Sequence, residues 1–264
     1  SDYAELKKKF KEVEKDISVN QFCEQYLTET GLEELRFSLK NYVEGYYAAD
    51  TEKASTLSMK KELTESDDKQ YRIEEGYGAM IDHLTSRCLE NGVEIMLSQK
   101  VKKVKWQKHD VMVITVKGNF SARQVMITVP VGVLQHKKIE FLPELPQKME
   151  AAGKLGFGPV IKVIILFHDA FWKDKKNTQN INLDSLGFIF SDCAIPTWWT
   201  PYPKNTPMLT GWCGGPNAKK IGHLSKEDIF NKGIESLSEI FSIKTKELQK
   251  LVVAYYVSNW SKDP

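Results

Sequence analysis

The sequence has few cysteines and no long hydrophobic run, and both shortages exclude whole classes of protein. Its 264 residues include four cysteines, which stand far apart without a CxxC motif: Cys23, Cys88, Cys193 and Cys213. This spacing matches no zinc site and favours reduced thiols over a disulfide framework. The most apolar run covers residues 160–167, far short of the roughly 20 residues that span a bilayer. The sequence therefore predicts no membrane partner.

An excess of charge of one sign is also missing. The chain has 37 basic and 35 acidic residues, for a net charge of +2. A surface that binds nucleic acid needs clustered basic charge that displaces counterions from phosphates, so we expect no nucleic-acid partner. With 41% hydrophobic and 27% charged residues, the composition is that of a globular protein long enough to bury a sizeable core.

Catalytic motifs that are recognised by their spacing are absent too. The sequence has neither an HExxH zinc motif nor a GxSxG nucleophile elbow. Gly76 and Gly78 resemble part of a dinucleotide-binding loop, but Ile81 occupies the third glycine position and no strand is expected before it. The five histidines form no evident triad, so each is interpreted as a surface or core residue.

The N-terminal part is expected to be helical. Helical spacing connects four apolar residues, namely Leu6, Phe10, Val13 and Ile17. Ser18 with Gln21 fits a capping box that starts a second helix over residues 19–30, and a third helix follows from Leu32. The polar stretch over residues 50–70 interrupts the periodicity and is the first candidate domain boundary.

Short β-rich runs dominate the rest of the chain. After a helix that ends at Asn91-Gly92, closely spaced runs are predicted to form an antiparallel meander, at residues 93–97, 101–106, 111–116 and 125–129. Later runs predict a second sheet with helices, at residues 160–167, 187–190, 208–213 and 251–257. We therefore predict an α+β fold in which a mixed sheet is flanked by helices and accompanied by the small antiparallel β-meander.

Lys162 departs from the apolar pattern of its strand. Alternation places it on one face with Val160, Ile164 and Leu166, where an ammonium would be desolvated. Burial favours the neutral amine, which can hold a water or pass a proton at neutral pH. Alternatively, Lys162 lies near a sheet edge and its ammonium reaches solvent.

The aromatic pair Trp198-Trp199 also has two interpretations. It fits either a wall facing a substrate or the cover of a core.

Several motifs in one order resemble the flavin-containing amine oxidases, and within them the polyamine oxidase and histone lysine demethylase branch. They are residues 125–134 (VMITVPVGVL), Ile139 to Pro143, residues 155–158 (LGFG) before Lys162, Phe171-Trp172, residues 211–215 (GWCGG), and Trp260 before Asp263-Pro264. The resemblance covers most of the chain, and residues 1–70 match loosely.

The resemblance implies bound FAD and the oxidation of an amine, most simply a polyamine, to an imine. Hydride would pass to the flavin, and oxygen would then yield peroxide. Carried over by motif, the catalytic residue is Lys162, which would hold a water beside the flavin N5. The backbone of Val101 would lie near the adenine, Thr128 and Pro130 would line the FAD, and Trp260 would approach the flavin ring.

The chain also departs from the family, whose members begin with a GxGxxG segment and end with a segment that closes over the flavin. Neither is found in this sequence, which predicts an internal piece of a larger oxidase. Residues 1–70 would be the helical part of the substrate domain, residues 71–135 the middle portion of the FAD-binding domain, and residues 136–264 the substrate-binding domain.

Two kinds of partner are implied for such a piece, a small amine substrate and the missing FAD-domain segments. Alone, the piece is expected to be inactive and its binding of FAD is in doubt. Two alternatives stay open. One is a truncated homologue that acts as a binding or scaffolding module, and the other is an oxidase of monoamines or amino acids.

Overall fold

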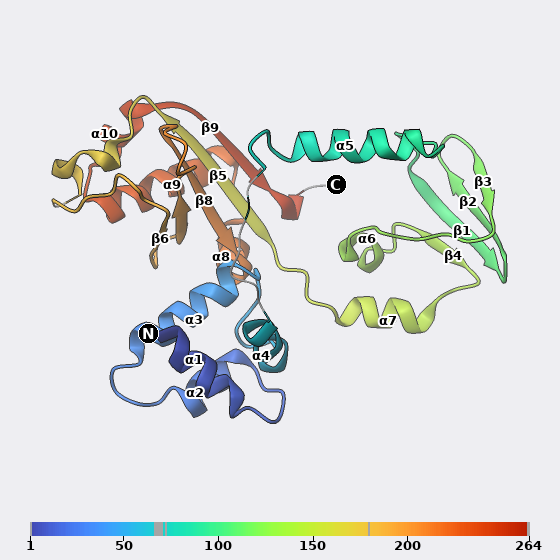
Figure 1. Cartoon of the computed structure of the whole chain (residues 1–264), viewed down its shortest axis with the longest axis horizontal. Helices are drawn as coiled ribbons and strands as arrows, with labels where there is room; N and C mark the ends of the chain where they lie inside the picture. The colour runs from blue at the N-terminus through green and yellow to red at the C-terminus, as the bar shows by residue number, and fades with distance from the viewer. Residues whose placement is uncertain (1, 66–70, 72, 179, 263–264) are drawn as a thin grey trace. The chain divides into compact units, whose positions relative to one another are not determined.

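The chain divides into two units in its computed structural model (Figure 1), which describes residues 2–65, 71, 73–178 and 180–262. One unit comprises Ser1–Glu65 with Gly158–Pro264, and the other comprises Ser66–Phe157. Within the described ranges, no helix is both long and apolar enough to cross a membrane. The first division falls inside the polar stretch over residues 50–70 that the sequence marks as a boundary.

Four helices form the N-terminal part of the first unit: α1 (Asp2–Lys11), α2 (Val19–Tyr26), α3 (Glu33–Gly45) and α4 (Thr56–Glu65). The predicted capping box is confirmed, since the Ser18 hydroxyl accepts from the Gln21 N–H while the Gln21 side chain accepts from the Ser18 N–H. α2 ends at Tyr26, earlier than expected. α4 lies in the polar stretch because Met59 and Leu63 are buried in the same small core as α1 and α3.

The rest of the first unit contains a five-stranded sheet and, over the described residues, three helices. Its strands lie in the order β6 (Phe188–Phe190), β7 (Thr197–Trp199), β8 (Met208–Gly214), β5 (Val160–Phe167) and β9 (Val252–Asn259). Every neighbouring pair is antiparallel. β7 lies outside the predicted β-rich runs. The helices of this part are α8 (Gly215–Ile221), α9 (Lys226–Phe241) and α10 (Thr245–Leu251), with 3₁₀ turns at Phe171–Lys173, Lys175–Asn177 and Trp260–Lys262 (η3).

Alternation along β5 decides which face of this sheet is covered. Ile161, Val163 and Ile165 are fully buried, and they pack in one core with Ile234 and Leu237 of α9. α9 lies along this side of the sheet in Figure 1. The residues between them on β5 are only half-buried, and we call this opposite face of the sheet the open face.

The second unit contains the smaller sheet. Its elements are α5 (Tyr77–Glu90), β1 (Val101–Gln107), β2 (Asp110–Thr115), β3 (Asn119–Ala122), α6 (Val131–Gln135), β4 (Glu140–Leu142) and α7 (Pro146–Lys154). The strand order is β3-β2-β1-β4. β1 to β3 form an antiparallel meander, while β4 pairs with β1 in parallel. β1 and β2 match two of the predicted runs, whereas β3 lies outside them. The α+β class is confirmed, although the parallel pair lies in the smaller sheet and the larger sheet is antiparallel.

Two predicted strands of the meander do not form. Residues 93–97 and 125–129 are outside any strand, because an apolar run becomes a strand only where a neighbour takes its backbone hydrogen bonds. Leu97 and Met126 are 81% and 88% exposed.

The second domain boundary differs from the predicted one. The pairing of β4 with β1 places residues 136–157 in the second unit, whereas the sequence groups them with the substrate-binding domain.

Candidate active site

Lys162 lies on the open face of the larger sheet. Its strand, β5, is an inner strand between β8 and β9, and Lys162 stands opposite Trp212 on one side and Ser258 on the other. Its side chain is half-buried, while Ile161 and Val163 beside it are fully buried on the covered face. Lys162 therefore shares a face with Val160 and the other half-buried residues of β5, as alternation predicts, and it does not belong to an edge strand.

A row of aromatic rings crosses the open face beside Lys162. The Lys162 Nζ lies 6.0 Å from the ring centroid of Trp199, a distance at which an ammonium is attracted to an indole face. Ring centroids are 6.2 Å apart between Trp199 and Trp212, and 6.1 Å between Trp212 and Trp260. In the other direction, Phe188 lies 5.9 Å from Trp199 and 6.1 Å from Phe190. We call these five residues the aromatic row.

The two neighbouring tryptophans of β7 divide between the two faces of the sheet. Trp199 belongs to the aromatic row. Trp198 is fully buried on the other face, where its indole N–H donates to the Ile195 carbonyl at 3.0 Å. Trp198 therefore covers the core, while Trp199 lies on the open face, because successive side chains of a strand point to opposite faces.

Trp212 connects the aromatic row to the helical part of the unit. Its indole N–H donates to the backbone carbonyl of Gly45, at the end of α3. The strand that carries Trp212 also approaches this helix closely, since a Cβ added to Gly214 would lie 2.5 Å from the Glu44 carbonyl oxygen. Glycine is thus required at 214 for the two elements to meet.

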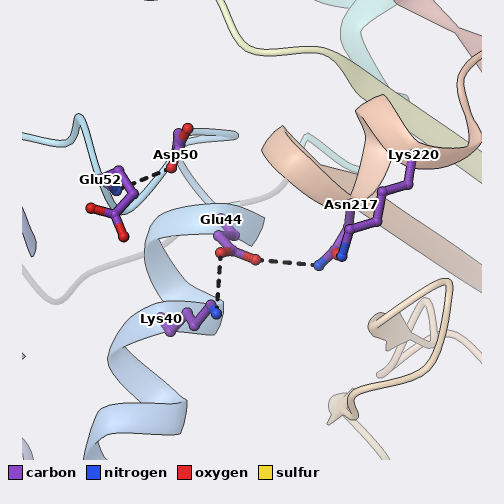
Figure 2. A network of polar contacts seen from close by, with 6 residues as sticks. All are labelled: Lys40, Glu44, Asp50, Glu52, Asn217 and Lys220. Carbon is purple, nitrogen blue, oxygen red and sulfur yellow. Dashed lines mark hydrogen bonds and ion pairs between the residues drawn. The ribbon is translucent and has the colours of Figure 1, made fainter. Parts of the chain in front are cut away.

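Glu44 is the most enclosed carboxylate of this region (Figure 2). It is 8% exposed, and burial raises the pKa of its carboxyl. The side-chain amide of Asn217 on α8 donates to it at 3.3 Å, and the Lys40 ammonium lies 3.9 Å away. Asp50 lies in the same view and accepts the Glu52 N–H at 3.0 Å. Glu44 is therefore a partnered structural carboxylate between α3 and α8.

The other predicted cofactor residues lie in the second unit. Val101 begins β1 and pairs with Thr115. Val101 packs against a small core that Val129 also contacts, while Thr128 and Pro130 are exposed on either side of Val129. Pro130 precedes α6. The predicted site residues thus form two groups, Lys162 with Trp260 in one unit and these three in the other.

The sequence does not single out Trp212 or Phe188 as site residues. Their rings join the row through cross-strand neighbours that are distant along the chain, and spacing carries no information about such pairs. The only available signal is the alternation within each strand.

Over the described residues, no group of three histidines, cysteines or carboxylates is arranged to hold a metal ion.

Comparison with known proteins finds a family model, "Flavin containing amine oxidoreductase", that matches residues 2–264. "Lysine-specific histone demethylase 1 homolog 2" of Arabidopsis thaliana is 40% identical over 181 residues, which cover 67% of this chain and 24% of that protein. "Polyamine oxidase 4" of Oryza sativa subsp. japonica is 28% identical over 228 residues, which cover 84% and 42%. The chain spans less than half the length of these relatives.

Solved structures share the fold. Wild-type putrescine oxidase bound to putrescine is similar with a TM-score of 0.72 and 19% identity, and the match covers 94% of this chain and 54% of that one. Cyclohexylamine oxidase from Brevibacterium oxydans IH-35A is similar with a TM-score of 0.66 and 15% identity, with the same coverage. The α+β arrangement of two sheets with helices is therefore that of known amine oxidase structures.

Proposed function

Since the chain belongs to the flavin-containing amine oxidoreductase family, we propose that it is part of an FAD-dependent enzyme that oxidises an amine to an imine. The observation that carries the proposal is Lys162, a single ammonium held at a row of indole rings on an open sheet face. FAD, when bound, supplies the two-electron acceptor, and oxygen then yields peroxide. The chain's own residues would position the amine and a water.

The residues present fit a flavin by their chemistry. An ammonium carries three donors and no acceptor, which suits the ring nitrogens and carbonyl oxygens of a flavin. The indole of Trp260 is 45% exposed and offers a flat apolar surface of the kind that packs on a planar ring. In the second unit, Thr128 is exposed, next to the exposed residues Val125, Met126 and Ile127.

Each group has a distinct proposed role. Lys162 would hold a water by its Nζ, and the surrounding indoles would exclude other solvent from the reacting amine. Trp260 would pack on the flavin ring. Val101, by its backbone, and Thr128 and Pro130 would hold the rest of the cofactor. These roles follow from the motif resemblance and stay proposals.

The polyamine part of the prediction rests on motifs and on the names of relatives such as "Polyamine oxidase 4". Monoamines and amino acids remain the alternatives, and so does a binding or scaffolding role without catalysis.

The domain roles also stay proposals. Residues 1–70 and 136–264 would belong to the substrate side, and residues 71–135 to the FAD side. The chain alone would be inactive.

The test uses the full protein that contains this chain. We expect flavin absorption bands in the purified protein, bleaching of these bands when an amine is added without oxygen, and their return on admission of air with release of peroxide. Bands that no amine, polyamine or amino acid bleaches would contradict the oxidase. A protein that stays colourless after incubation with FAD and desalting would favour the scaffolding role. The same incubation of the 264-residue chain tests whether this chain alone binds FAD.

A further inference from the structure

We infer that the open face of the larger sheet binds an uncharged, apolar arm of the substrate, so that the preferred amine carries one amino group rather than several. The inference rests on the proposed function and names the substrate class of the same site. It is carried by the charge of the face, the exposure of its rings and the partners of the nearest buried carboxylate.

Among the residues of the five described strands, Lys162 is the single charged side chain on the open face. Cross-strand partners share a face of a sheet. Lys162 and its neighbours two residues away pair with residues of β8 and β9. The β8 residues pair in turn with β7, and the β7 residues pair with β6. These are aromatic, aliphatic or hydroxyl side chains. Every residue of the five strands is among those described, and on this face none of them is a carboxylate. An ammonium group on the open face would therefore have no counter-charge there.

Glu44 does not supply the missing charge. Its carboxylate is 8% exposed and already has the Lys40 ammonium and the Asn217 amide as partners. A substrate ammonium bound on the open face would instead approach the Lys162 ammonium. Repulsion between like charges grows as water is excluded, and the face of Trp199 that attracts cations already has Lys162 beside it. A second amino group is thus disfavoured at this surface.

An apolar arm, in contrast, has a matching surface. Phe188 and Phe190 are 56% and 60% exposed, and with Trp199 they extend the aromatic row away from Trp260 with ring spacings of about 6 Å. An alkyl or aryl group laid along these rings would remove their apolar surface from water, which is favourable in proportion to the area buried.

The experiment compares two amines of equal length on the full flavin-bearing protein, heptylamine and 1,6-diaminohexane, in which a terminal methyl group is replaced by an ammonium. We expect kcat/KM for heptylamine to be at least tenfold higher. Phe188→Ala should raise KM for heptylamine severalfold with little change in kcat, whereas Phe37→Ala, at an exposed phenylalanine of α3 outside the row, should change neither constant.

A gain of function tests the charge argument separately. Phe188→Glu should shift the ratio of the two kcat/KM values toward the diamine, because it places a carboxylate on the open face. Quenching of tryptophan fluorescence by heptylamine gives a binding readout that is independent of turnover. If the diamine is the better substrate, or if Phe188→Ala leaves KM for heptylamine unchanged, the inference is overturned while the oxidase stands. If neither these nor other amines bleach the flavin, the proposed function itself fails.

Discussion

The indole N–H of Trp212 donates a hydrogen bond of 2.7 Å to the carbonyl oxygen of Gly45, a residue 167 positions earlier in the chain. Gly45 is the last residue of α3, and the final carbonyls of a helix have no partner within the helix itself. The bond therefore satisfies a helix end and fixes the indole between Trp199 and Trp260. One side chain thus links the helical part of the unit to the open face of the sheet.

Trp212→Phe tests this link, because it keeps an aromatic ring and removes the donor. Loss of the bond should lower the free energy of unfolding by about 1 kcal/mol, measured by urea denaturation. Trp260→Phe is the matched control, since among the described residues its indole nitrogen has no hydrogen-bond partner. Equal effects of the two substitutions would contradict a specific role for the Gly45 contact.

Local signals in the sequence predicted the parts of the fold that depend on nearby residues. The capping box of Ser18 and Gln21 starts α2, and the alternating run over residues 160–167 is β5 with Lys162 on its half-buried face. The family was identified from motifs in their order, and the match over residues 2–264 confirms it.

What the sequence did not predict depends on distant partners. Residues 93–97 and 125–129 have the composition of strands but no strand to pair with in the described chain. Trp212 joins the aromatic row through cross-strand neighbours, and no spacing rule predicts its bond to Gly45. Trp198 and Trp199 could be assigned to the covered face and the open face only once the covered face of the sheet was known.

Asp16 provides a test of pH dependence. Its carboxylate accepts the Leu57 N–H at 3.1 Å and the Ser55 hydroxyl at 2.8 Å, at the start of α4, and these bonds lower the pKa of Asp16 below its usual value. A lowered folded-state pKa adds stability above the unfolded pKa, near 3.9, and this stability is lost as the pH falls through the lower folded value.

Asp16→Asn should therefore lower the free energy of unfolding by about 1 kcal/mol at pH 7, as the loss of a helix cap does. The difference from the unmodified chain should shrink as the pH is reduced below about 4. Denaturant titrations across this range measure it, with Glu14→Gln as a control at an exposed neighbouring carboxylate. A difference that stays constant with pH would refute the role of the ionised carboxylate.

Cys213 should be the least reactive thiol. It is fully buried, and burial raises its pKa to about 12, so its thiolate is scarce at pH 8 and reagents cannot reach it. Iodoacetamide followed by mass spectrometry should modify Cys88, which is half-buried on α5, before Cys213. Rapid labelling of Cys213 in the folded chain would show that the core around β8 is more open than the structure indicates.

Gly211 tests the packing between β8 and β7. A Cβ added at Gly211 would lie 2.7 Å from the Trp198 Cη2 and 2.9 Å from the Ile195 Cγ2, inside the fully buried layer. Gly211→Ala should therefore destabilise the chain by about 1–3 kcal/mol, the usual result of overpacking. Gly187→Ala, which would meet no atom within 4 Å, is the control and should stay within about 0.5 kcal/mol. Thermal denaturation of the two variants measures the contrast.

The most direct test of the proposed site is the reoxidation of reduced flavin in a Lys162→Met variant of the full protein, followed by stopped-flow absorption after mixing with oxygen. Lys102→Met, at an exposed lysine of β1, is the control. If the Lys162 ammonium holds the water beside the flavin, reoxidation should slow at least tenfold in Lys162→Met and stay unchanged in the control, while flavin content is retained in both. Unchanged reoxidation in a Lys162→Met protein that carries its flavin would contradict the account.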